Sequence, residues 1–225
     1  MIEAVLKGRL ADPSLLRTGG VVNGNWLEAG ANTFAVTNPA NGELIASLTA
    51  MGPSETEAAI DAAYVAQKDW AARTGKERAT VLRKLYDLMV ANADDLATIL
   101  TMEMGKPLAE AKGEILYGAS YVEWFAEEAK RVYGDVIPGH QADKRIVVIK
   151  QPVGVVGMIT PWNFPNAMLA RKMAPALAVG CAVVAKPAGE TPLSAIALAV
   201  LAERAGLPAG LFNLITSTDG PSVGK

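Results

Sequence analysis

Three short apolar runs separated by two helical segments constrain the fold of this 225-residue chain more than any other feature. The runs cover residues 153–159, 182–185 and 211–215, and the helical segments cover about 165–179 and 191–205. This alternation of strand and helix is typical of a parallel sheet with right-handed crossovers. Because such a sheet is covered on both faces and normally has more than three strands, we expect these runs to begin a larger sheet.

The residues before this sheet predict a short β region and then a series of helices. Residues 21–48 alternate like strands around Asn41-Gly42, a pair that favours a hairpin turn. A helix is expected from Ser54, which has capping-box spacing to Glu57. Further helices are expected over about 76–90, 92–102 and 108–131, then a loop over 134–144 and a strand over 146–149. The fold class is therefore α/β, with a helical N-terminal region before an incomplete Rossmann-like parallel sheet.

The composition excludes several classes of partner. A formal net charge of −2 creates no general field for nucleic acid or an anionic membrane. The single cysteine cannot form an internal disulfide, which fits the cytoplasm, and one histidine with one cysteine leaves too few ligands for a structural zinc site. We find no signal peptide and no apolar stretch of bilayer length. We therefore expect a cytoplasmic protein with no metal, nucleic acid or membrane partner.

The first motif that could carry chemistry is the end of the strand over residues 153–159. The sequence Thr160-Pro161-Trp162-Asn163-Phe164-Pro165 follows it, and ligands of open α/β sheets bind at such carboxyl ends. The neutral amide of Asn163 could stabilise a developing oxyanion. The alternative is a tight loop in which Trp162 fills the core and Asn163 caps the next helix. The local pattern alone favours that alternative.

The second motif lies at the end of the next strand, where Lys186-Pro187-Ala188-Gly189 leads into a helix with Thr191 as a possible cap and Pro192 at its first position. A lysine at this place can bind ribose hydroxyls or a phosphate, although a solvated lysine at a strand end is common. Lys186 follows Asn163 by 23 residues, so two successive strand ends present polar groups to one rim of the sheet. This repetition favours a binding site.

The two motifs together resemble those of the aldehyde dehydrogenase superfamily. The resemblance extends back through residues 103–107 (Glu-Met-Gly-Lys-Pro) and 38–42 (Asn-Pro-Ala-Asn-Gly), and covers the chain from about Val22 onward. Details over 144–146 and 166–172 are most similar to the NAD(P)-dependent succinate-semialdehyde dehydrogenase branch. The resemblance implies that the chain is the N-terminal part of such an enzyme.

The resemblance also implies a role for each matching residue. Asn163 corresponds to the catalytic residue that holds the oxyanion, and Lys186 to the lysine that binds the adenosine ribose. NAD-selective relatives often carry glutamate where this chain has Gly189, so the cofactor is expected to be NADP or NAD, with the neighbouring Glu190 leaving the choice open. The full set of expected cofactor-binding residues is Ile159, Thr160, Pro161, Trp162, Asn163, Lys186, Pro187, Ala188 and Gly189.

Two residues are expected to contact the substrate. Arg171 corresponds to an arginine that faces the remote carboxylate of succinate semialdehyde, for which a guanidinium fork is suited. Phe164 corresponds to a residue of the substrate tunnel. The alternatives are a helix-surface arginine and a core phenylalanine. Cys181 enters a buried strand, and an apolar environment makes a thiol inert, so we interpret it as structural.

These expectations give a functional hypothesis with two alternatives. The chain is predicted to be the N-terminal cofactor-binding portion of an enzyme that oxidises a carboxylate-bearing semialdehyde, inactive alone because its nucleophile and base lie downstream. The alternatives are a non-catalytic dinucleotide-binding or assembly module of the same fold and a reductase relative acting on an acyl-CoA or acyl phosphate. The partners expected are a small aldehyde and further copies of the chain, as a dimer or tetramer.

The predicted organisation has three parts. Residues 1–138 form the hairpin and helical part of the cofactor-binding domain, and residues 139–151 a strand and linker toward an oligomerisation element. Residues 152–225 form the first part of the Rossmann-like sheet, and the catalytic domain is absent.

Overall fold

The computed structural model describes residues 1–28 and 30–224, and it has the α/β fold that the sequence predicts. Its central sheet has the strand order β2-β1-β9-β8-β7. The helices are α1 (Ala4–Lys7), α2 (Pro53–Ala72), α3 (Gly75–Ala91), α4 (Ala93–Met104), α5 (Leu108–Glu128), α6 (Ala167–Ala178), α7 (Pro192–Arg204) and α8 (Gly220–Val223), with a 3-10 turn η1 (Pro13–Leu15). The strands are β1 (Val21–Val22), β2 (Asn25–Trp26), β3 (Thr33–Thr37), β4 (Leu44–Thr49), β5 (Asp135–Pro138), β6 (Arg145–Val148), β7 (Val155–Ile159), β8 (Ala182–Lys186) and β9 (Phe212–Leu214).

The three predicted apolar runs form the parallel part of the central sheet. β8 pairs in parallel with β7 on one side and with β9 on the other. β1 continues the sheet beyond β9 in the antiparallel direction, and β2 pairs with β1. The prediction of parallel strands is confirmed, and the N-terminal residues contribute the two antiparallel strands.

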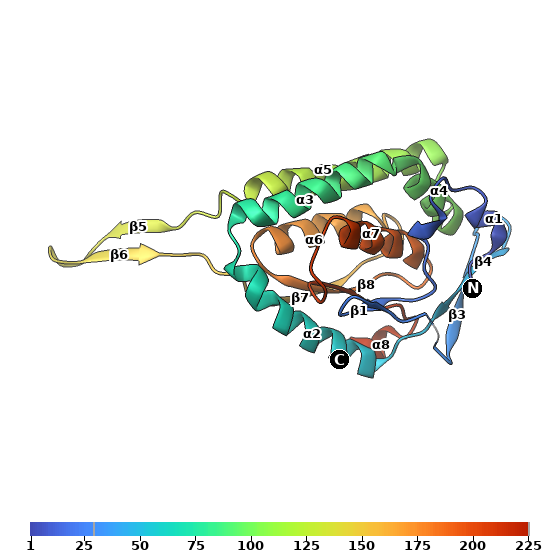
Figure 1. Cartoon of the computed structure of the whole chain (residues 1–225), viewed down its shortest axis with the longest axis horizontal. Helices are drawn as coiled ribbons and strands as arrows, with labels where there is room; N and C mark the ends of the chain where they lie inside the picture. Colours follow the sequence, from blue (N-terminus) through green and yellow to red (C-terminus); the bar gives the residue numbers. More distant parts are fainter. Residues whose placement is uncertain (29, 225) are drawn as a thin grey trace.

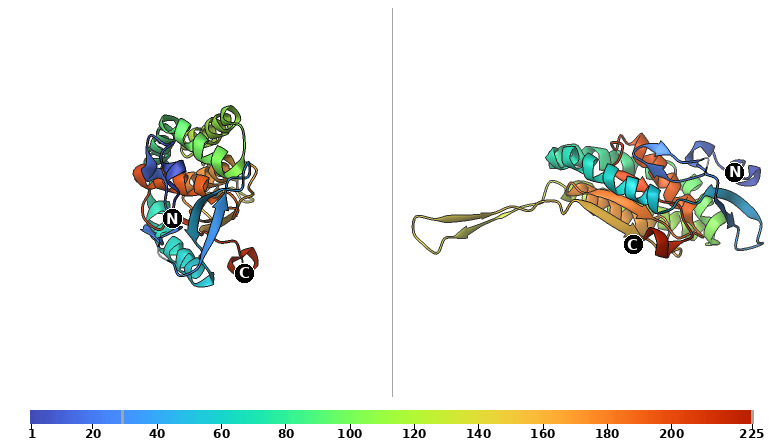
Figure 2. Two further views of the ribbon diagram at one scale, coloured as in Figure 1. Left: turned by 90° about the vertical axis from the view of Figure 1, so that its right-hand side faces the viewer. Right: turned by 90° about the horizontal axis from the view of Figure 1, so that it is seen from below.

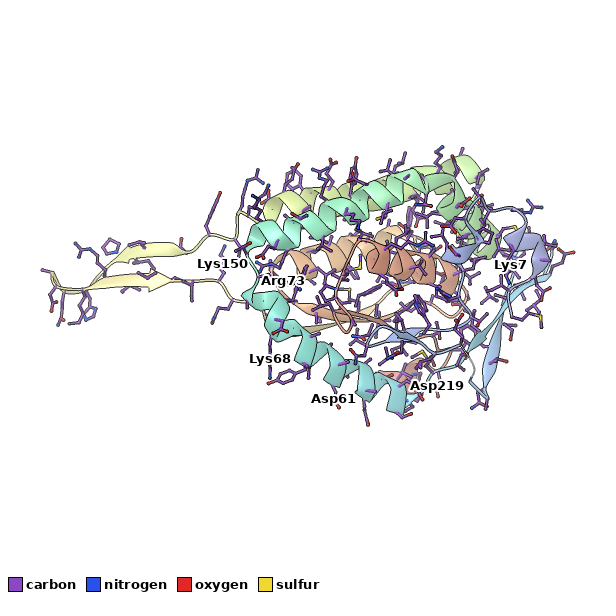
Figure 3. The ribbon with its side chains drawn as sticks, in the orientation of Figure 1. Lys7, Asp61, Lys68, Arg73, Lys150 and Asp219 are labelled. Carbon is purple, nitrogen blue, oxygen red and sulfur yellow. The ribbon has the colours of Figure 1, made fainter. Side chains whose placement is uncertain are left out.

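Helices cover both faces of this sheet. Figure 1 shows α6 and α7 on one face, with α3 and α5 stacked outside them, and α2 and α8 on the opposite face. The first four residues of β8 are buried, and Val183 is completely inaccessible. Along α2, the charged side chains of Asp61 and Lys68 are exposed on the outer surface (Figure 3). The hydrophobic core therefore lies between the sheet and its two helical layers.

The start of α2 differs from the sequence prediction. The helix begins at Pro53, and the side chain of Glu55 accepts a hydrogen bond of 2.8 Å from the backbone N–H of Gly52. The predicted cap formed by Ser54 and Glu57 is wrong by two residues. Proline is favoured at the first helical position because it has no N–H to satisfy there, so Pro53 marks the start better than the hydroxyl of Ser54.

Two hairpins lie outside the central sheet. In the β3–β4 hairpin, Gly42 has a φ of 75°, which supports the predicted turn at Asn41-Gly42. The loop predicted over 134–144 is wrong at residues 135–138, because β5 pairs with β6. This second hairpin projects away from the body of the molecule (Figures 1 and 2). The predicted boundary between residues 138 and 139 falls between its two strands.

Two kinds of feature are absent from residues 1–28 and 30–224. No helix there has the length and hydropathy needed to cross a bilayer. Among the same residues, no group of three or more histidine, cysteine, aspartate or glutamate side chains has the arrangement of a metal site.

Candidate active site

The two motif-bearing loops leave neighbouring strands at the same edge of the sheet. Ile159, the last residue of β7, lies opposite Lys186, the last residue of β8. The backbone N–H of Thr160 then donates a hydrogen bond of 3.2 Å to the carbonyl of Lys186. The prediction that the strand ends lie side by side is confirmed, and the loops that follow form one rim.

A cavity of about 440 Å³ opens at these strand ends. Its volume lies within the range of about 300–1,000 Å³ typical of small-molecule sites. Its walls are mainly apolar, and Lys186 supplies the charged group. The lining residues are Thr56, Ile60, Val155, Gly157, Met158, Ile159, Val184, Lys186, Ile215, Val223 and Gly224. A larger cavity of about 800 Å³ is lined by residues 26–28, 30–32, 49–53 and 217–219, with Glu55 and Ser222.

The loop after β7 exposes three of the residues that were expected to meet ligands, Pro161, Trp162 and Asn163, and buries a fourth, Thr160. Trp162 is 54% exposed, so the alternative in which it fills the core is wrong. Asn163 is also exposed, and because α6 begins only after Asn166, Asn163 is not its N-cap. Thr160 is buried, and its hydroxyl has no hydrogen-bond partner among the described residues. Pro161 is exposed beside Trp162.

The loop after β8 places a half-buried lysine at the rim. The ammonium group of Lys186 donates a hydrogen bond of 3.3 Å to the carbonyl of Pro187. Burial lowers the pKa of Lys186, and the nearby carboxylate of Glu190 opposes that shift. Across the described part of the chain, Lys186 makes no ion pair. The lysine therefore retains donor capacity for a hydroxyl or a phosphate.

The turn beyond Lys186 is tightly packed. Pro187 is buried, and Ala188 and Gly189 are half-buried. A Cβ atom on Gly189 would lie 2.9 Å from Cγ2 of Thr218, closer than carbon atoms normally approach. Glycine therefore fits this turn for a steric reason.

The N-terminus of α7 is capped by a residue far away in the sequence. Pro192 is the first residue of α7, as predicted, but the Thr191 side chain makes no cap hydrogen bond. Instead, the buried carboxylate of Glu103 accepts hydrogen bonds of 2.7 Å from the backbone N–H groups of Leu193 and Ser194. Burial raises the pKa of Glu103 to about 8, and these two hydrogen bonds oppose the shift. This contact joins α4 to the helix that follows the Lys186 loop.

A buried ion pair lies behind the Asn163 loop. The ammonium group of Lys106 lies 2.5 Å from the carboxylate of Glu114 and 3.1 Å from the backbone carbonyl of Asn163. Glu114 also accepts hydrogen bonds from the backbone N–H groups of Asn166 (3.1 Å) and Ala167 (3.3 Å). The pair thus connects α5 and the loop before it to both ends of the turn that leads into α6.

The two predicted substrate residues lie near this network. Phe164 is 38% exposed, so it is not a core residue, and its ring centroid is 3.7 Å from the ammonium group of Lys106. Arg171 is exposed on α6, and its guanidinium carbon is 5.8 Å from the ring centroid of Tyr121 on α5. The hydroxyl groups of Tyr121 and Tyr117 are 2.5 Å apart. Arg171 therefore has an aromatic neighbour and a free face.

Cys181 is 1% exposed and precedes β8. Its thiol is enclosed by the core, so it cannot approach a substrate at the rim. This burial agrees with its interpretation as a structural residue.

No role was predicted from the sequence for Lys106, Glu114 or Glu103. The signal for Glu114 lies in the helical pattern, since Ala111, Ile115 and the small residues after them form the buried stripe of α5. A carboxylate on that stripe indicates a buried partner. The identity of the partner could not be read from the sequence, because Asn166 is 52 residues away.

Comparison with known proteins finds relatives that match the sequence of this chain. The profile described as "Aldehyde dehydrogenase family" matches residues 26–225. The succinate-semialdehyde dehydrogenase [NADP(+)] of Escherichia coli is 60% identical over 94% of the chain, which covers 44% of that relative. A glutarate-semialdehyde dehydrogenase of Pseudomonas aeruginosa is 58% identical over 96% of the chain and 45% of that relative.

The fold comparison gives the same result. A crystal structure described as an E. coli NADP-dependent enzyme superposes with a TM-score of 0.94 at 60% identity, covering 96% of this chain and 45% of that one. The chain spans less than half the length of the curated relatives that it matches.

Proposed function

This chain belongs to the aldehyde dehydrogenase family, and we propose that it is the cofactor-binding portion of an NAD(P)-dependent enzyme that oxidises a carboxylate-bearing semialdehyde to its acid. The observation that carries this proposal is the pairing of Ile159 with Lys186, which brings the Asn163 loop and the Lys186 loop to one rim. Open α/β sheets bind ligands at such a rim.

The residues at the rim fit a dinucleotide. Lys186 supplies a half-buried cation with donor capacity at the strand end. In the proposed role, Lys186 donates a hydrogen bond to a ribose hydroxyl, and residues 159–162 with 187–189 line the nucleotide. The bound nicotinamide supplies the hydride acceptor.

The amide of Asn163 is the proposed catalytic group of this chain. Its N–H donates a hydrogen bond to the oxygen of the aldehyde as negative charge develops there, and a neutral donor holds this role across a wide pH range. Because Cys181 is buried, the attacking thiol would come from residues outside this chain. We therefore expect the 225 residues alone to be inactive.

The choice between the two nucleotides depends on the turn at Gly189. A glycine there places no negative charge beside the ribose, which permits a 2′-phosphate. The E. coli relative is named for NADP(+), which supports NADP as the preferred cofactor, with NAD as the second candidate.

The proposed substrate is succinate semialdehyde. The names of the two relatives specify succinate semialdehyde and glutarate semialdehyde, both of which carry a carboxylate remote from the aldehyde. Arg171 is the proposed partner of this carboxylate, since its exposed guanidinium can donate two parallel hydrogen bonds. Phe164 would line the path between the carboxylate and the reacting carbon.

The proposed assembly is a homo-oligomer, a dimer or a tetramer, in the cytoplasm. The β5–β6 hairpin exposes Val136 (74%) and Val147 (67%), and an isolated two-stranded hairpin is only marginally stable in water. Covering these side chains with another copy of the chain would remove apolar surface from water.

A chimera tests the proposal directly. Residues 1–224 of this chain would replace the matching segment of the E. coli succinate-semialdehyde dehydrogenase, which supplies the remaining residues. We expect the chimera to reduce NADP⁺ with succinate semialdehyde and the Asn163→Ala variant to lose about a hundredfold or more in kcat. A folded chimera without activity, or an Asn163→Ala variant with full activity, would contradict the proposal.

A further inference from the structure

We propose that Lys106 and Glu114 form a clamp that positions the Asn163 amide for catalysis, an inference that rests on the proposed role of Asn163. Neither residue touches the substrate in this account. They act on the backbone that carries Asn163, so they are positioning residues. The clamp is the triangle of the Lys106 ammonium, the Glu114 carboxylate and the turn over residues 163–167.

One side of the clamp holds the start of α6. The first N–H groups of a helix have no partner within the helix, and a carboxylate there is also favoured by the helix dipole. Asn166 makes no side-chain cap, and Glu114 instead reaches across from α5 to accept from the N–H groups of Asn166 and Ala167. Glu114 is 4% exposed, so water cannot replace it easily.

The other side of the clamp holds Asn163 itself. Lys106 donates to the Asn163 carbonyl and lies over the ring of Phe164, the next residue. Lys106 therefore fixes the Asn163 backbone through an oxygen that is not used in the proposed reaction. The side-chain amide stays free to face the aldehyde.

The burial of this ion pair gives it a large effect. The side chains of Lys106 and Glu114 are 10% and 1% exposed, whereas those of Lys112 and Asp94, also joined by an ion pair, are 47% and 85% exposed. Removing one partner of a buried pair leaves an uncompensated charge, while exposed pairs contribute little. Lys112, which lies on α5, is therefore a matched control for Lys106.

The first test measures amide hydrogen exchange by NMR in this chain. We expect Lys106→Met to speed exchange at Asn166 and Ala167 at least about tenfold relative to Lys112→Met, because local opening sets that rate. The amide of Val183, bonded to Leu211 within the sheet, reports global opening and should match in both variants. Equal exchange at residues 166 and 167 in the two variants would overturn the clamp. If Lys106→Met does not fold, the near-isosteric Glu114→Gln takes its place with the same criterion.

The second test measures kinetics in the chimera, with Asn163→Ala as the reference. We expect Lys106→Met to lower kcat by about 10- to 100-fold with little change in KM, since a misplacement of about 1 Å can cost about a hundredfold. Lys106→Arg should recover part of the lost kcat, and Lys112→Met should leave kcat unchanged. Unchanged kcat in Lys106→Met would overturn the positioning role. A reduced rate in Asn163→Ala at the same time would leave the proposed function standing.

Discussion

β8 and β6 have similar sequences and opposite environments. β8 reads Ala-Val-Val-Ala-Lys and is buried over its first four residues, while β6 reads Arg-Ile-Val-Val and is exposed throughout. β8 has a parallel partner on each side, and β6 pairs only with β5. A β-branched apolar run therefore predicts a strand but not its location. The helices that flank β8 in the sequence are what place it in a covered sheet.

The largest expected difference is in folding stability. Val183→Asp would place an unpaired charge at a position with no exposure, and we expect it to cost more than about 4 kcal/mol of unfolding free energy. Val147→Asp, at 67% exposure on β6, should cost less than about 0.5 kcal/mol in the monomer. Urea denaturation of both variants checks the prediction. Similar losses in the two would show that the hairpin is part of the folded core.

The β5–β6 hairpin should affect self-association rather than folding stability. We expect Val136→Lys with Val147→Lys to weaken self-association at least about a hundredfold, because charges would enter an apolar contact. Val5 and Val65, which are 59% and 68% exposed on α1 and α2, provide the matched double lysine control. Sedimentation velocity distinguishes the outcomes. An oligomer that persists in the hairpin variant would place the interface elsewhere.

Arg171 lies on α6, the helix that follows β7. We expect it to determine which aldehyde the enzyme prefers. In the chimera we expect Arg171→Ala to lower kcat/KM for succinate semialdehyde by about 10- to 100-fold, the value of a charged hydrogen-bonded contact. The value for butanal, which lacks the carboxylate, should change little. Equal losses for both aldehydes would remove Arg171 from the carboxylate site.

The turn at Gly189, after β8, should control the preference between NADP⁺ and NAD⁺. Gly189→Glu would place a carboxylate beside the ribose, and we expect the ratio of kcat/KM for NADP⁺ to that for NAD⁺ to fall about tenfold or more. Gly189→Ala is the control, since it adds only the Cβ that meets Thr218. An unchanged ratio in Gly189→Glu, or the same fall in Gly189→Ala, would refute a role for charge at this turn.

The smallest expected effect is the pH dependence from Glu103 beneath α7. Because burial raises its pKa to about 8, the folded chain holds this proton more tightly than the unfolded chain does. The resulting stability is complete below the normal glutamate pKa and is lost as the pH rises toward about 8. We expect Glu103→Gln to reduce this decline by about 1 kcal/mol or more, measured by denaturation from about pH 5 to about pH 8. If Glu110→Gln, at an exposed site, reduced the decline in stability as much as Glu103→Gln does, the effect would belong to another group.

The sequence predicted local and repeated features better than long-range contacts. The strands β7, β8 and β9 follow from apolar runs separated by helices, and the Asn41-Gly42 turn follows from its backbone preferences. β5 was missed because its residues lack a clear alternating pattern and depend on the pairing with β6.

In the candidate site, too, the sequence predicted the local motifs better than the long-range contacts. The motif residues after β7 and β8 were found because they follow recognisable strands. The contacts of Glu103 with α7 and of Glu114 with α6 join residues about 90 and about 50 positions apart, and only the folded chain brings them together.

An NMR titration of the ¹⁵N-labelled chain with NADP⁺ tests the shared rim most directly. We predict that amide signals over 159–164 and 186–189 shift together with one dissociation constant, while those of the β5–β6 hairpin do not move. Shifts confined to one of the two loops, or shifts at the hairpin alone, would contradict the account.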